Sequence, residues 1–338
     1  MQSIATAPPG LSSEAHHAHP GVGSTFLKHF IRSPLHAWAA FIDPERERVD
    51  SAVFRFGRAW HCALFEPSEF DARYTTGHDA GPATKRAVLL QQVLDGQVKL
   101  EQLVSLPDEL SPTTKEGKAL IAEISGRGDV PVAASDMQFV AEWLPKLQGR
   151  EVLGAEAIRK IRKMASIARA LPISRVVFDQ QGEHGVAEQS LVITDDDSGV
   201  LLKIRPDYML TPCAAFPNGL IIDGKSTTDA DVNGFGRQVW NLDYGLQAAV
   251  YTRVYQRVFG TSERPEFLWL AQEKDAPHAA RYYSASRDLI AHYDARLSAI
   301  LPKVAQCQQT GIWPGYPETV EPLSLPVWAQ RAMQGAAA

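Results

Sequence analysis

Apolar residues recur at helical spacing through the first half of the chain. Residues 24–42 and 51–70 place apolar side chains three or four positions apart, which predicts two helical segments, the first broken at Pro34. The same periodicity predicts three further helices, which lie within residues 84–100, 135–149 and 151–171. The first half is therefore expected to be mostly helical, with loops between these segments.

The pattern changes near residue 175, where short apolar runs and turn residues replace the helical spacing. Residues 184–210 predict two strands joined by a tight turn at "DDDSG", since acids and glycine suit a reversal. Residues 219–225 predict a third strand. Four more elements complete the chain: a long helix over 234–260, strands over 264–273 and 280–286, and a closing helix over 287–311.

This order of elements predicts an α/β fold with a helical N-terminal part. Residues 1–22 are rich in proline, glycine, serine and histidine, and they predict a disordered tail. No composition break follows, so residues 23–332 are expected to form a single domain.

Composition narrows the classes of protein that fit. A net charge of -5 and a pI of about 6.1 exclude a strongly basic DNA-coating protein, but an acidic protein can still carry a local basic cleft. Cys62, Cys213 and Cys307 are too dispersed for a zinc or iron–sulfur site, which favours a reducing, cytoplasmic setting. No apolar run or signal-like start is present, so no membrane association is expected.

Charged residues follow the predicted strand at 219–225. In "LIIDGKSTTDADV", Asp223 and Lys225 are two apart and so share one face of the strand. Asp207, in "KIRPDYML", ends the preceding strand and could lie at the same sheet edge. Two carboxylates and a lysine are the groups that metal-assisted phosphodiester hydrolysis needs. The alternative is a structural ion pair between Asp223 and Lys225.

Two helices carry further candidates. Gln247 and Tyr251 are four residues apart and so share one face of the helix that follows the lysine strand. His61 follows Gly57 by four residues in the predicted helix at 51–70. The alternatives are a core tyrosine beside a surface glutamine, and a histidine buried in the core.

These motifs together resemble a known family. "RPD" followed by "IIDGK" resembles the PD-(D/E)xK nuclease signature, and the spacings Gln-x-x-x-Tyr and Gly-x-x-x-His resemble its RecB-like branch. The whole chain from about residue 24 to 332 resembles the RecE-type exonuclease VIII group. The resemblance is carried, in the family's order, by "GRAWHCALFEPSEF", "AEQSL", "IRPDYM", "IIDGKSTTDADVNGF", "YGLQAAVYTRVY", "WPGY" and "LSLPVWA".

The resemblance implies a restriction-endonuclease-like core of the lambda-exonuclease type, in which a central mixed β-sheet is flanked by helices. It also implies a divalent-metal mechanism that uses Mg²⁺, with Mn²⁺ as a substitute. The metal ligands it implies are His61, Asp207, Asp223 and the carbonyl of Gly224, with Lys225 as the catalytic lysine and Gln247 and Tyr251 lining the site.

A second group of residues is assigned supporting roles by the same resemblance. Glu188, in "AEQSL", matches an acid of the family and is expected either to pair with Arg205 or Lys203 beside the metal or to form a plain structural ion pair. Arg205 and Thr227 are candidates for support or DNA contact. The chain departs from the family at Gly224, where a bulky apolar residue is common.

The implied function is a 5′→3′ exonuclease that acts on double-stranded DNA ends and leaves single-strand overhangs for phage-type recombination. The implied partners are a homo-oligomeric ring, a tetramer by family analogy, and a single-strand annealing protein. Two alternatives stay open: another nuclease of the same fold, or an inactive nuclease fold that serves as a DNA-binding scaffold. Loss of an acid or the lysine would mark the scaffold, and Asp207, Asp223 and Lys225 are all present.

Overall fold

The computed structural model describes residues 11–46, 51–76, 83–107, 110, 112–147, 149–178 and 184–325. The predicted helical segments at its N-terminal end are confirmed. They form α2 (Ser24–Arg32), α3 (Pro34–Phe41), α4 (Ala52–Phe65), η1 (Pro67–Glu69) and α5 (Phe70–Arg73). The break at Pro34 arises because Ser33 caps α3 by accepting a hydrogen bond from the amide of His36.

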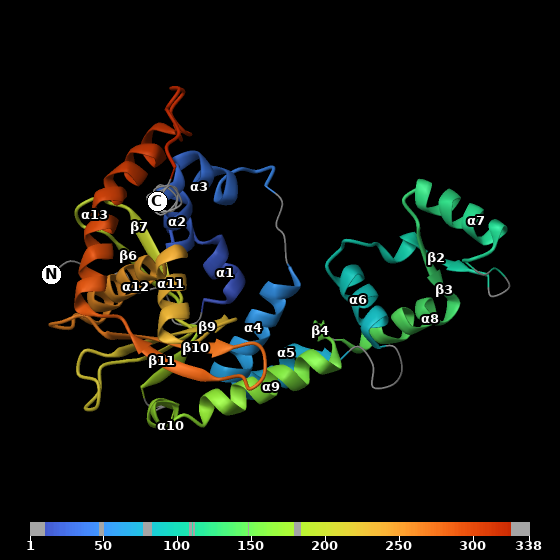
Figure 1. The fold of residues 1–338 in the computed structure, drawn as a ribbon, viewed down its shortest axis with the longest axis horizontal. Coiled ribbons are helices and arrows are strands. Elements are labelled where there is room, and N and C mark those ends of the chain that lie inside the picture. The colour runs from blue at the N-terminus through green and yellow to red at the C-terminus, as the bar shows by residue number, and fades with distance from the viewer. Residues whose placement is uncertain are drawn as a thin grey trace, which may run out of the picture.

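A five-stranded mixed sheet lies inside the larger body of the molecule, on the left of Figure 1. Its order is β11-β10-β9-β8-β5, with only β9 and β10 parallel to each other. The strands are β5 (Gly185–Ala187), β8 (Tyr208–Leu210), β9 (Leu220–Thr227), β10 (Glu266–Glu273) and β11 (Ala280–Ser284). This arrangement confirms the α/β fold with a mixed sheet flanked by helices.

Helices cover both faces of the sheet. Successive apolar residues of its strands point to opposite faces, so each face forms its own hydrophobic core with the helices that cover it. Ile221 and Trp269 pack toward α2, α12 (Tyr244–Phe259), α13 (Arg287–Thr310) and the hairpin of β6 (Leu191–Thr194) and β7 (Leu201–Ile204). Ile222 and Leu268 pack toward α4, α9 (Ala155–Arg169) and α10 (Pro172–Phe178).

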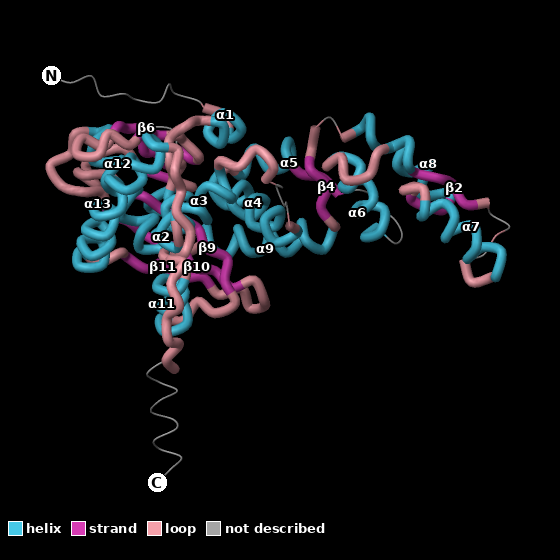
Figure 2. Tube along the Cα trace, turned by 90° about the horizontal axis from the view of Figure 1, so that it is seen from above, coloured by secondary structure: helices cyan, strands magenta, loops and turns pink. Residues whose placement is uncertain are grey.

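An elongated lobe projects from this body (Figures 1 and 2). It leaves the body through β1 (Tyr74–Thr76) and returns through β4 (Glu151–Leu153), and these two strands pair in parallel. It contains α6 (Ala83–Leu94), η2 (Leu100–Gln102), β2 (Leu103–Leu106), α7 (Lys115–Gly126), β3 (Val130–Ala133), α8 (Ala134–Trp143) and η3 (Leu144–Lys146). Leu90, Phe139 and Val140 belong to a hydrophobic cluster of its own. That residues 23–332 form one domain stays a prediction.

The prediction of a disordered tail is wrong for residues 11–22. Residues Ser13–Ala18 form α1, and Val22 pairs with Leu202 of β7. The Lys203 ammonium donates to the carbonyls of His16 and His19 at 2.8 Å each, which satisfies the free carbonyl groups at the end of α1. Composition alone could not predict this order, because the partners lie about 180 residues away. Residues 1–10 lie outside the described part.

Two other elements differ from their predictions. The two strands expected in 184–210 are four short strands, β5 to β8, because the chain leaves the central sheet to form the β6–β7 hairpin. The expected long helix at 234–260 is divided into α11 (Val232–Asn241) and α12, since Asp243 between them has a left-handed backbone with φ of 48°. Among the described residues, none of the helices combines the length and apolar character needed to cross a bilayer.

Candidate active site

The predicted site residues converge where β8 and β9 meet α4 and α12. Asp207 immediately precedes β8, and its Oδ2 accepts a hydrogen bond from the amide of Gly224 at 2.7 Å. Asp223, Gly224 and Lys225 are consecutive residues of β9. The antiparallel pairing of β8 with β9 therefore brings the two carboxylates to one side of the sheet, as predicted.

Asp223 is held from both sides by groups that the sequence placed near it. Gln247 of α12 donates from Nε2 to Asp223 Oδ1 at 2.6 Å, and the ammonium of Lys225 forms an ion pair with Oδ2. The Asp223 side chain is only 2% exposed, so this pair is strongly shielded from water. The Asp223–Lys225 ion pair is thus present, within a cluster that also holds a second carboxylate.

His61 of α4 reaches the same cluster. Its Nε2 lies 3.0 Å from the carbonyl oxygen of Gly224, and its Nδ1 lies 3.4 Å from Asp207 Oδ1. The neighbouring Trp60 is fully buried and donates from Nε1 to Gln272 of β10 at 2.8 Å, which fixes α4 against the sheet. His61 therefore faces the acids, and the interpretation as a histidine isolated in the core is not supported.

The structure explains the departure from the family pattern at Gly224. A Cβ atom at this position would lie 3.1 Å from the rings of Trp60 and Phe65. The space that a bulky side chain would need is occupied by α4 itself. Glycine thus permits the close approach of α4 that carries His61 to the sheet.

Glu188 lies closer to the acids than the sequence indicated. Ligand atoms of His61, Glu188 and Asp207 all lie within 4.8 Å of one another. One imidazole nitrogen and carboxylate oxygens form a donor set that suits Mn²⁺ or Mg²⁺. These three residues fit a divalent ion, with Asp223 beside them.

The acids are poorly neutralised without a cation. Burial, together with the neighbouring Asp223, raises the pKa of Asp207 to about 8. Burial and the nearby Asp207 raise the pKa of Glu188 to about 7. Two carboxyl groups that resist ionisation side by side are what a metal site presents before its ion binds, because the cation supplies the missing positive charge.

Burial and neighbouring charges shift the pKa values of His61 and Lys225 in opposite directions. Burial and the Lys225 ammonium lower the pKa of His61, so the imidazole is neutral at pH 7 and can act as a metal ligand. Burial alone would lower the pKa of Lys225, but Asp223 and Asp207 outweigh this effect and raise it. Lys225 is therefore a permanent cation beside the carboxylates.

Arg205 connects Glu188 to the N-terminal segment. Its Nε donates to Glu188 Oε2 at 2.8 Å, and its Nη1 donates to the carbonyl of Leu11 and the hydroxyl of Ser190. Of the two cations considered for Glu188, Arg205 forms the pair, whereas Lys203 binds the end of α1. Tyr251 donates its hydroxyl to the Arg205 carbonyl at 3.3 Å and so supports the same strand end.

Thr227 has a structural position. Its hydroxyl accepts hydrogen bonds from Gln238 Nε2 at 2.6 Å and from the amide of Asp229 at 3.1 Å. These bonds tie the end of β9 to α11. The hydrogen bonds of Thr227 in the described part of the chain do not involve Asp207 or Asp223.

Sequence reasoning missed two residues near the lysine. The ring centroid of Tyr244 lies 4.9 Å from the ammonium of Lys225, and also 4.9 Å from that of Lys28 on α2. Burial and the Lys225 charge lower the pKa of Lys28 to about 8. Tyr244 precedes Gln247 by three residues, so helical spacing could have placed both on one face.

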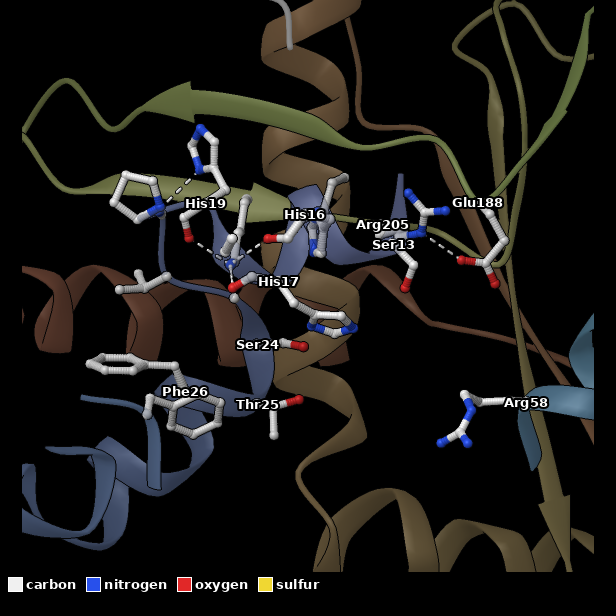
Figure 3. Close-up of a pocket in the computed structure, with 18 of the residues that line it drawn as sticks. Ser13, His16, His17, His19, Ser24, Thr25, Phe26, Arg58, Glu188 and Arg205 are labelled. Atoms are coloured by element: carbon white, nitrogen blue, oxygen red, sulfur yellow. Dashed lines mark hydrogen bonds and ion pairs between the residues drawn. The ribbon is translucent and has the colours of Figure 1, made fainter. Parts of the chain in front are cut away.

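A cleft of about 870 Å³ opens beside the site (Figure 3). His16 and His17 of α1 line one side, while Arg58 of α4 lies on the other, with Glu188 and Arg205 between them. His61 also lines the cleft. The side chain of Arg58 is 49% exposed. Glu188 and His61 are therefore open to a ligand from a cleft that contains several basic groups, whereas Asp223 is buried behind them.

The fold and the site define a PD-(D/E)xK-type nuclease core. A family model described as a PDDEXK-like domain of unknown function (DUF3799) matches residues 137–326, more than half of the chain, and the protein belongs to this family. The family and the grouping of Asp207, Asp223 and Lys225 together support a nuclease.

Two solved structures are similar to the chain. One is titled "Putative exonuclease" from Eubacterium rectale, with 12% identity, a TM-score of 0.44, and coverage of 96% of this chain and 99% of that chain. The other is titled SSO0001, with 12% identity, a TM-score of 0.28, and coverage of 66% and 87%. No curated protein matches the chain.

The raised pKa of Asp207 predicts a stability change that needs no substrate. Because the folded state holds the Asp207 proton up to about pH 8 and the unfolded state releases it near 3.8, the metal-free protein should lose stability as pH rises between these values. Asp207→Asn has no proton to lose and can still accept the Gly224 hydrogen bond. At pH 8 in EDTA, its Tm should exceed that of the wild type by about 2–5 °C.

Thermal melts at pH 5 and pH 8 test this prediction. The difference between Asp207→Asn and wild type should shrink at pH 5, where Asp207 is protonated in the folded protein. Asp71→Asn, which alters an exposed acid on α5, is the matched control and should show no such pH dependence. A lower Tm for Asp207→Asn at pH 8 would contradict the assignment of an unfavourably buried carboxylate.

Proposed function

We propose that this protein is a divalent-metal-dependent exonuclease that digests double-stranded DNA from its ends in the 5′→3′ direction. The observation that carries the proposal is the gathering of Asp207, Asp223 and Lys225 at one sheet edge, with His61 and Glu188 beside them. The exonuclease activity and its direction are supported by the resemblance of the ordered motifs to the RecE-type group.

His61, Glu188 and Asp207, with Asp223 adjacent, would hold Mg²⁺ or Mn²⁺. The ion supplies an activated water and positive charge against the phosphate when it is bound. Gln247 and Lys225 fix the orientation of the Asp223 carboxylate. The Lys225 ammonium, charged at all relevant pH values, is placed to orient the attacking water or to stabilise the negative charge that grows on the phosphate.

The cleft beside α1 and α4 is the proposed path for the DNA strand. Its lining includes Arg46, Arg58 and Arg73, and basic side chains favour the phosphate backbone. A net charge of -5 does not oppose this role, since arginine and lysine outnumber glutamate and aspartate among the residues that line the cleft. We further propose a cytoplasmic protein that forms a ring, a tetramer by family analogy, and acts with a single-strand annealing protein.

The test uses linear duplex DNA labelled at the 5′ or the 3′ end, with closed circular duplex as the control substrate. Mg²⁺-dependent release of 5′-labelled mononucleotides before 3′ label, with circles left intact, is the expected result. Nicking or linearisation of the circles would replace the proposal with an endonuclease of the same fold. Binding of duplex without hydrolysis in Mg²⁺ or Mn²⁺ would indicate a scaffold.

His61→Ala provides a second prediction. If His61 is a ligand, its loss should weaken the apparent affinity for Mn²⁺ or Mg²⁺ by about 10- to 100-fold, in the range found when the surroundings of a metal are altered. The melting temperature in EDTA should fall only modestly: the imidazole packs beside the rings of Trp60 and Phe65, and among the described residues its nitrogens lie near Asp207 and the Gly224 carbonyl.

Isothermal titration of the metal and metal-dependent cleavage both measure this effect. His36→Ala is the matched control, since His36 lies on α3 and its ring nitrogen bonds to Ser33, away from the acids of the site. Superimposable titrations for wild type and His61→Ala would leave the carboxylates as the only side-chain ligands.

A further inference from the structure

The ring of Tyr244 is shared by two lysine side chains from different parts of the chain. Lys225 comes from β9 and Lys28 from α2, and each ammonium lies 4.9 Å from the ring centroid. Lys225 has Asp223 as its ion-pair partner. Within the described part of the chain, no carboxylate forms an ion pair with Lys28.

Two ammonium groups near one another repel, and burial strengthens the repulsion. The face of an aromatic ring carries negative potential, so it attracts a cation without competing for the metal as a carboxylate would. Tyr244 therefore offsets the charge of Lys28 and Lys225 while leaving the acids of the site available. An aliphatic residue of similar size could fill the space but could not stabilise the two ammonium charges.

The backbone that presents Tyr244 is built by long-range contacts. Asp243 has a left-handed backbone with φ of 48°, which is unfavourable for a residue with a side chain. Arg296 of α13 donates to Asp243 Oδ1 at 2.7 Å and stabilises this corner. Two positions after Asp243, a Cβ on Gly245 would come within 2.1 Å of the Tyr293 ring, so only glycine permits α12 to start here.

These contacts have one consequence for the site. The corner ends α11, restarts the chain as α12 and places Tyr244 in the first turn of the new helix, one turn before Gln247. A continuous helix through Asp243 would point this side chain elsewhere. Strained backbone that is held by neighbouring elements commonly marks a functional position.

We propose that Tyr244 is a positioning residue for Lys225: its ring face holds the ammonium in place between Asp223 and the substrate phosphate. For the catalytic effect, this inference rests on the proposed nuclease function. The contact itself does not. The hydroxyl of Tyr244 forms no hydrogen bond in the described part of the chain. The contact with Lys225 is therefore made by the ring alone, and phenylalanine at position 244 should preserve it.

The experiment measures the reactivity of individual lysines in the metal-free protein. Wild type, Tyr244→Phe, Tyr244→Leu and Tyr244→Met are treated with trace acetic anhydride, and peptides are quantified by mass spectrometry. In the Leu and Met variants, acetylation of Lys225 and Lys28 should rise by about 3- to 30-fold, the range that a partly buried cation–π contact represents. Tyr244→Phe should match wild type, and exposed Lys163 of α9 is the internal control.

Cleavage kinetics form the second arm. In Tyr244→Leu, kcat should fall about 10-fold with KM within twofold of wild type, and Tyr244→Phe should restore the rate. Tyr316→Leu, at an exposed tyrosine bonded by Arg32, should change neither reactivity nor rate.

The two arms separate the two proposals. If wild type does not cleave DNA but Lys225 reactivity still follows the ring, the proposed function fails and the positioning role stands. Equal Lys225 acetylation in wild type, Tyr244→Leu and Tyr244→Met would overturn the positioning role, as would a Phe variant that behaves like Leu.

Discussion

Replacing Asp207 or Asp223 by alanine should reduce DNA cleavage by about 1,000-fold or more. A metal ion contributes several kcal/mol to the stabilisation of a phosphoryl transition state, and each 1.36 kcal/mol corresponds to a tenfold change in rate. Asp207 is one of three residues whose ligand atoms lie within 4.8 Å of one another, and Asp223 is held beside them. Loss of either carboxylate should leave the ion insufficiently bound.

The two variants should differ in stability although both lose activity. Asp207→Ala removes an acid whose pKa is raised to about 8 by burial and by Asp223, which offsets the loss of the hydrogen bond from the Gly224 amide, so the Tm of the metal-free protein at pH 8 should change little. Asp223→Ala leaves the Lys225 ammonium buried without its carboxylate, which should lower the Tm. Single-turnover digestion and thermal melts in EDTA measure the two effects.

Asp71→Ala on the surface of α5 is the matched control for both measurements. Digestion at a rate near that of wild type by a folded Asp207→Ala or Asp223→Ala protein would refute the assignment of the site. If both variants lose activity but change Tm by the same amount, the assignment of the site would stand. The different electrostatic roles of Asp207 and Asp223 described above would be contradicted.

Much of this architecture could be predicted from the sequence because local patterns specified it. The helices at 24–42, the strands at 264–273 and 280–286, and the helix at 287–311 follow apolar periodicity and were found where expected. The convergence of Asp207, Asp223 and Lys225 was also predictable, although the strand ends were not: Asp207 precedes β8, and the antiparallel pairing of Tyr208 with Ile222 brings it beside Asp223 within β9.

The parts that could not be predicted depend on distant partners. The turn at Asp243 is held by Arg296, about 50 residues away, so the sequence around it reads as one helix. Helix α1 is held by Ser190 and Lys203, through bonds that span more than 170 residues. Glu188 reaches the cluster with a left-handed backbone, φ 53°, which the motif "AEQSL" does not reveal.

Gly224 shows how a departure from a family pattern can be compensated. The sequence has glycine where a bulky apolar residue is common in the family, which would leave space at this position. Instead, Trp60 and Phe65 occupy the space from the opposite helix, and Trp60 bonds to Gln272 of the adjacent strand. Side chains of α4 therefore pack where a side chain at position 224 would lie, and only the three-dimensional arrangement shows this.

Lys225→Ala should lower the rate of chemistry by about 100-fold or more, in the range for loss of one preorganised electrostatic contact. Metal binding should persist, because the ligand atoms of His61, Glu188 and Asp207 do not include the lysine. The affinity for duplex DNA should also persist within severalfold, since basic side chains of the cleft remain. Lys163→Ala, at an exposed lysine of α9, is the matched control.

Lys225→Arg should fail to restore the rate, and the structure provides the reason. The Lys225 ammonium fits between the Asp223 carboxylate and the face of the Tyr244 ring, where a compact cation is required. A planar guanidinium is larger, and its donors form a fixed fork that would compete with Gln247 for Asp223. Single-turnover rates at saturating Mg²⁺ measure the effect without interference from product release. An arginine variant with the wild-type rate would show that position 225 needs only a positive charge, and an alanine variant with that rate would remove Lys225 from the chemistry.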